Sequence, residues 1–153
     1  MACPYFWPTD PLPAWTWPGK PRPPLGEPYA GVCRARQDQD FRPGEDFLIK
    51  VCNLGYPALD CTRFPAEAGP DAVRFSVMLD DDQLVRITYV VEKGHAAYEN
   101  GFLEYDRAVN AWSSATLRPL LQRQADAYLN SYLRQKQKTR TTQAKRSKTS
   151  AWR

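Results

Sequence analysis

Hydrophobic and polar residues alternate along two stretches in the middle of the chain. From residue 72 to 79 every second side chain is large and apolar, and the alternation returns from residue 84 to 92. A period of two places the apolar side chains on one face of a β-strand. Residues 80–83 have the length of a hairpin connection, and a third strand is expected at 98–105. The pattern therefore predicts a small antiparallel three-stranded meander.

Nearer the C-terminus, apolar residues recur at intervals of three and four. The members of this stripe are Leu117, Leu121, Ala125, Tyr128, Leu129 and Tyr132. Such spacing is typical of a helix with one apolar face, and it predicts a helix over about 116–136 that packs on the sheet. Pro119 falls in its first turn, where a missing amide costs little. The expected fold class is α+β, a three-stranded meander packed by one long C-terminal helix.

The N-terminal region has a different composition. Nine of the 14 prolines lie in the first 30 residues, which excludes a helix or a central strand there. The same region carries six aromatic residues: Tyr5, Phe6, Trp7, Trp15, Trp17 and Tyr29. Leaving these rings in water is costly, so we expect an irregular arm that lies along the domain with its rings buried.

The chain has 153 residues, of which 42% are hydrophobic and 25% charged, as in ordinary proteins with one core. We expect a single metal-stapled α+β domain over 1–137 and a basic, disordered tail over 138–153. Within the domain, the expected parts are the arm (1–32), the cysteine region (33–71), the meander (72–112) and the helix (113–137).

Four cysteines in the first two fifths of the chain are the main candidates for chemistry: Cys3, Cys33, Cys52 and Cys61. Four thiols complete a tetrahedral zinc site or ligate one iron-sulfur cluster. Residues 43–53 are predicted to form a short helix with Cys52 in its last turn, and the loop that follows brings Cys61 back. Near Cys61, Arg63 is a candidate to donate hydrogen bonds to cluster sulfur or to form an ion pair with Asp60. The alternative is a solvated surface residue.

Spacing distinguishes between the two metals. Successive cysteines are separated by 29, 18 and 8 residues, so no pair forms the tight turn of two to four residues that structural zinc sites usually contain. The four irons of a 4Fe-4S cube are separate attachment points and can be reached from distant stretches of chain. We therefore expect a 4Fe-4S cluster, either structural or electron-transferring, with zinc as the alternative. Two disulfides or four inert buried thiols are the other interpretations.

Charge is distributed unevenly along the chain. Eight of the 21 basic residues and none of the 17 acidic ones lie from Arg134 to Arg153, so a basic tail follows a net acidic body. This asymmetry indicates contact with nucleic acid, an acidic partner or a membrane surface. The candidate nucleic-acid-binding residues are Arg134, Lys136, Lys138, Arg140, Lys145, Arg146, Lys148 and Trp152. A solubilising tail is the alternative.

Signatures of catalysis and export are missing from the sequence. The lone histidine, His95, has no hydrolase, metalloprotease or phosphate-loop motif around it, so we do not expect an enzyme. No apolar stretch approaches the ~18 residues that a membrane helix needs, and the first 13 residues do not resemble a signal peptide. We expect a cytoplasmic protein without a membrane span, whose partner is a redox protein or a larger complex.

Overall fold

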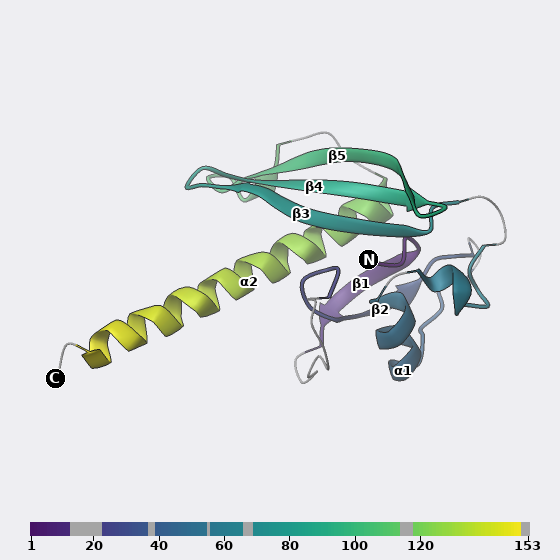
Figure 1. Cartoon of the computed structure of the whole chain (residues 1–153), viewed down its shortest axis with the longest axis horizontal. Coiled ribbons are helices and arrows are strands. Elements are labelled where there is room, and N and C mark those ends of the chain that lie inside the picture. The colour runs from purple at the N-terminus through teal and green to yellow at the C-terminus, as the bar shows by residue number, and fades with distance from the viewer. Residues whose placement is uncertain (13–22, 37–38, 55, 66–68, 114–117, 151–153) are drawn as a thin grey trace.

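The structure, a computed structural model, describes residues 1–12, 23–36, 39–54, 56–65, 69–113 and 118–150, and for 144–150 it describes only the backbone. These residues form two antiparallel sheets and a long C-terminal helix (Figure 1). The small sheet pairs β1 (Phe6–Pro11) with β2 (Tyr29–Cys33). The large sheet has the strand order β3-β4-β5-β6, with β3 at Ala72–Asp80, β4 at Leu84–Lys93, β5 at Ala96–Asp106 and β6 at Ala111–Trp112.

The prediction of a single three-stranded meander is wrong, although the α+β class is right. Strands β3, β4 and β5 lie where the alternating pattern places them, but β6 adds a fourth strand and β1 and β2 form a second sheet. Strand β6 has only two residues, which pair with Tyr105 and Asp106 of β5. A strand of that length is too short to show any alternation in the sequence, so pattern analysis cannot find it.

The small sheet replaces the predicted irregular arm. Pro8 and Pro11 lie within β1, and they are tolerated because β2 is the only strand that pairs with β1 in the described part of the chain. Opposite Pro8, Gly31 of β2 packs so closely that an added Cβ would lie 2.3 Å from the carbonyl oxygen of Trp7. Among the arm's described rings, Phe6 and Tyr29 are buried, whereas Trp15 and Trp17 lie outside the described residues.

One face of the large sheet packs against the helix α2 (Pro119–Ser150), and buried residues of the small sheet and of the cysteine region belong to the same core. The alternating residues of the strands are buried there, and the predicted helical stripe faces them. Its buried members include Leu121, Ala125 and Leu129, and the ring of Tyr128 stacks on that of Phe75 with the centroids 5.6 Å apart. Burying each large aliphatic side chain stabilises the fold by about 2 kcal/mol, so this face accounts for much of the hydrophobic stabilisation. Leu117 lies outside the described residues.

Helix α2 differs from its prediction at the C-terminal end. It continues to Ser150 and crosses the predicted boundary at residue 137, where the sequence indicates a disordered tail. Lys, Arg, Gln and Ala in this stretch favour helix, and the hydroxyls of Thr139, Thr141 and Thr142 donate to the carbonyls four residues earlier. Figure 1 shows this C-terminal half extending away from both sheets.

Candidate metal centre

Four separate segments carry the cysteines to one place. Cys33 is the last residue of β2, and its amide and carbonyl pair with Phe41 across an isolated bridge. Cys3 follows Ala2, whose backbone exchanges two hydrogen bonds with Val73 of β3. The amide of Cys3 donates to the carbonyl of Cys52 at 3.2 Å, which joins two of the segments directly.

Cys52 ends the short helix that the sequence predicts. That helix begins as α1 (Glu45–Phe47) and continues as a π-helical turn at Leu48–Cys52, a geometry that is rare and frequent at functional sites. The next residue, Asn53, is almost fully buried, and its side chain bonds both the amide and the carbonyl of Tyr29, at 2.9 and 3.0 Å. Asn53 therefore fixes the end of the turn, and with it Cys52, against β2.

Cys61 lies in the predicted irregular loop. A short 3-10 turn at Pro57–Leu59 precedes it, and its amide donates to the carbonyl of Pro57 at 2.7 Å. Cys3, Cys33 and Cys52 are 6%, 8% and 5% exposed, whereas Cys61 is half-buried. Cys61 is thus the most accessible of the four thiols.

All four predicted ligand residues line the same cavity. Apart from Arg63, the other walls are apolar or aromatic: Tyr5, Ala35, Phe41, Pro43, Phe47, Val51, Pro57 and Phe64. The cavity is narrow, with a volume of about 10 Å³, which is room for about one water molecule. All four cysteines are free, and no three His, Cys, Asp or Glu side chains of the described residues are close enough to share one ion.

Burial and mutual proximity favour the neutral form of two thiols. Burial raises the pKa of Cys52 to about 12, and the neighbouring Cys33 and Cys61 contribute to the increase. The pKa of Cys3 is also raised, first by burial and then by the other three cysteines, against a hydrogen bond from the backbone of Tyr5. Metal ligation requires thiolates, so a metal ion bound to these cysteines would displace their protons.

Among the described residues that line the cavity, Arg63 is the one that carries a charge. Its Nε and Nη2 are buried and have no hydrogen-bond partner in the described part of the chain, and its Cζ lies 4.3 Å from the centroid of the Phe41 ring. No ion pair joins Arg63 to Asp60 among these residues. Arg63 as a whole is half-buried, so its side chain is partly solvated and partly enclosed by the cavity wall.

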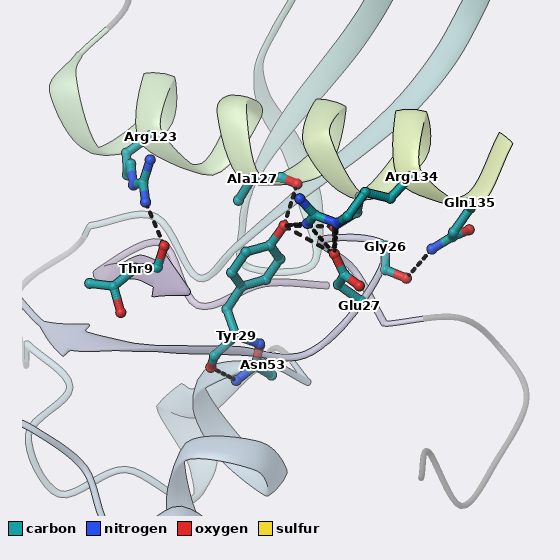
Figure 2. Close-up of polar contacts among 10 residues, drawn as sticks. Thr9, Gly26, Glu27, Tyr29, Asn53, Arg123, Ala127, Arg134 and Gln135 are labelled. Atoms are coloured by element: carbon teal, nitrogen blue, oxygen red, sulfur yellow. Dashed lines mark hydrogen bonds and ion pairs between the residues drawn. The ribbon is translucent and has the colours of Figure 1, made fainter. Parts of the chain in front are cut away.

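Two of the candidate nucleic-acid-binding residues are engaged within the protein. Arg134 forms an ion pair with Glu27 and donates to the hydroxyl of Tyr29, as Figure 2 shows. Lys136 pairs with Asp80, which also accepts hydrogen bonds from Tyr132 and Arg107. These donors outweigh the effect of burial and lower the pKa of Asp80 to about 2.

The remaining basic candidates lie farther along α2. Lys138 and Arg140 are exposed on the projecting part of the helix. For Lys145, Arg146 and Lys148 the structure describes only a helical backbone, and Trp152 lies outside the described residues.

Sequence analysis missed the polar residues that tie α2 to the cysteine region. Gln124 is fully buried, and its Nε2 donates to the carbonyls of Cys3 and Phe6, both at 2.7 Å. The guanidinium of Arg123 donates to the carbonyls of Pro8 and Thr9, and Nε2 of Gln135 donates to that of Gly26 (Figure 2). The only available signal was the polar face of a helix, which ordinarily indicates solvent.

Within the described residues, no helix combines the length and the apolar composition needed to cross a membrane. Comparisons with known protein families, with curated proteins and with solved structures found no match for the chain.

Proposed function

We propose that this protein binds a 4Fe-4S cluster through Cys3, Cys33, Cys52 and Cys61. The observation that carries the proposal is the convergence of four thiols, from four distant segments, on one apolar cavity. Chance burial of a cysteine is common because the thiol behaves as a small apolar group. Chance does not account for all four lying around one cavity together with a buried cation, Arg63.

The spacing of the cysteines along the sequence, with no tight pair, favours a cluster over a single zinc ion. The four cysteines line one cavity, but no three of the described His, Cys, Asp or Glu side chains are close enough to share an ion. Because the cavity is narrow, its walls would have to separate for either metal to bind, and the half-buried Cys61 and the exposed Phe41 lie where the walls are partly open to solvent.

We propose that the cluster chiefly stabilises the fold by cross-linking separate segments of the chain. It would connect the N-terminal segment, β2, the π-helical turn and the Cys61 loop, which belong to no common sheet. Three of the ligands are nearly inaccessible, so electron exchange with a redox partner would take place at the Cys61 side. Four free thiols suit a reducing compartment, and the proposal therefore includes a cytoplasmic location.

Metal analysis of anaerobically purified protein tests the proposal. We expect a brown protein with about four iron and four sulfide per chain. Cys61→Ser should lose most of the iron, whereas Thr62→Ala, at the exposed neighbouring position, should retain it. A colourless protein with one zinc would favour the alternative of a zinc staple, and one that takes up neither metal after reconstitution would contradict both.

A second candidate function concerns the projecting half of α2. We propose that it binds the phosphate backbone of nucleic acid without sequence preference, because an exposed helix with basic and no acidic residues complements a polyanion. A lipid surface or an apolar groove is less suitable, since residues 137–150 present no apolar face.

Binding to a random DNA duplex tests this second function. Affinity should fall steeply with added salt, and a chain shortened at residue 137 should lose it. Lys138→Gln with Arg140→Gln should weaken binding and reduce the salt dependence, whereas Thr139→Ala with Thr141→Ala serves as the control on the same helix. Binding that survives the truncation would contradict the proposal, and binding to an acidic protein alone would replace the nucleic acid as partner.

A further inference from the structure

The guanidinium of Arg63 lies in the wall of the cysteine cavity with part of its hydrogen-bonding capacity unused. Two of its N–H-bearing nitrogens are buried without an acceptor, in a wall otherwise made of apolar groups and thiols. Stacking over Phe41 orients the group but does not neutralise it. Buried donors that find no acceptor destabilise the folded chain.

A cluster held by four thiolates supplies what Arg63 lacks. Such a cluster carries net negative charge in both oxidation states, and its sulfurs accept hydrogen bonds. Among the described residues, no carboxylate forms an ion pair with Arg63. A bound cluster would therefore supply the acceptors that these residues do not.

We propose that Arg63 donates hydrogen bonds from Nε and Nη2 to sulfur of the bound cluster and thereby raises its reduction potential. One-electron reduction by an external donor adds one negative charge to the cluster. A fixed cation beside it stabilises the reduced form more than the oxidised form. This inference rests on the proposed iron-sulfur function and assigns to Arg63 the control of the potential and of iron retention.

Replacing Arg63 should have effects of opposite sign in the two forms of the protein. Arg63→Met keeps a long side chain and removes the charge, so the metal-free protein should melt at a higher temperature. In the cluster-loaded protein the same change should make the midpoint potential more negative and speed iron loss to a chelator about tenfold. Arg63→Lys, which keeps the charge but loses the planar fork, should fall between wild type and Arg63→Met.

The matched control is Arg42→Met, which removes an exposed guanidinium from a neighbouring segment. It should leave the potential and the rate of iron loss unchanged. If Arg63→Met takes up iron and sulfide like wild type, with an unchanged potential and similar melting shifts in both forms, the inference is wrong and the proposed function stands. Wild-type protein that takes up no iron and sulfide would overturn the proposed function and the role of Arg63 together.

Discussion

The large sheet packs against α2 through apolar contacts, whereas the cysteine region adds specific polar contacts to its share of the core. Val85, Ile87 and Leu103 are buried in the first region. In the second region, the side chain of Asn53 bonds three backbone groups and that of Gln124 bonds two. The difference teaches that the first region depends on apolar volume, whereas the second also depends on single polar groups.

The largest effect is expected from truncating the centre of the large sheet. Ile87→Ala should lower the free energy of unfolding by about 2–5 kcal/mol, because it leaves a cavity at a fully buried position. Thr88→Ala, on the opposite face of the same strand, should cost less than about 1 kcal/mol. Urea denaturation of both variants measures this, and equal losses would show that the two faces of the sheet are packed alike.

A smaller effect, of a different kind, is expected at Gln124. Gln124→Leu removes the donor to the carbonyls of Cys3 and Phe6 and should cost about 1–2 kcal/mol in urea denaturation. The loss should come with faster amide hydrogen exchange in β1, since that strand loses one of its links to α2 and keeps, among the described residues, only the hydrogen bonds from Arg123. Gln137→Leu, at an exposed position of the same helix, is the control. Uniform exchange changes across both sheets would contradict the distinction between the two regions.

The smallest effect is a pH dependence that arises in the cysteine region. Because the pKa of Cys52 is raised in the folded state to about 12, the metal-free folded protein at alkaline pH keeps a proton that the unfolded chain has released. The contribution of this thiol to stability should therefore be constant below about pH 8 and fall as the pH rises above the unfolded value, by about 1 kcal/mol at pH 10. Cys52→Ala should show a shallower fall over the same range, and identical pH profiles would exclude this thiol as a cause.

Sequence patterns predicted the strands and the helix whose buried residues recur at a regular interval. Strands β3, β4 and β5 and the start of α2 were found because their burial repeats every two or every three to four residues. Strand β1 was missed because prolines argue against a strand unless that strand is known to lie at the edge of a sheet. Strand β6 was missed because two residues are too few to show any periodicity. The end of α2 was missed because its polar sequence favours helix through propensity alone.

The sequence predicted which residues make up the candidate site, but it did not predict the residues that hold those cysteines in place. The residue type and number identified the four thiols, and the structure places them around one cavity. Neither Gln124 nor Asn53 was identifiable as a buried anchor, since their partners are backbone groups more than twenty residues away in the chain. The buried nitrogens of Arg63 were likewise invisible, because burial of a single arginine depends on tertiary packing.

The two carbonyls that Gln124 holds belong to residues near the start of the chain, and Ala2 pairs with Val73. During synthesis, the Cys3 segment therefore lacks these supports until β3 and α2 have both been made. If Cys3 ligates the cluster proposed above, its place in the site is set only after α2 has folded against the strands.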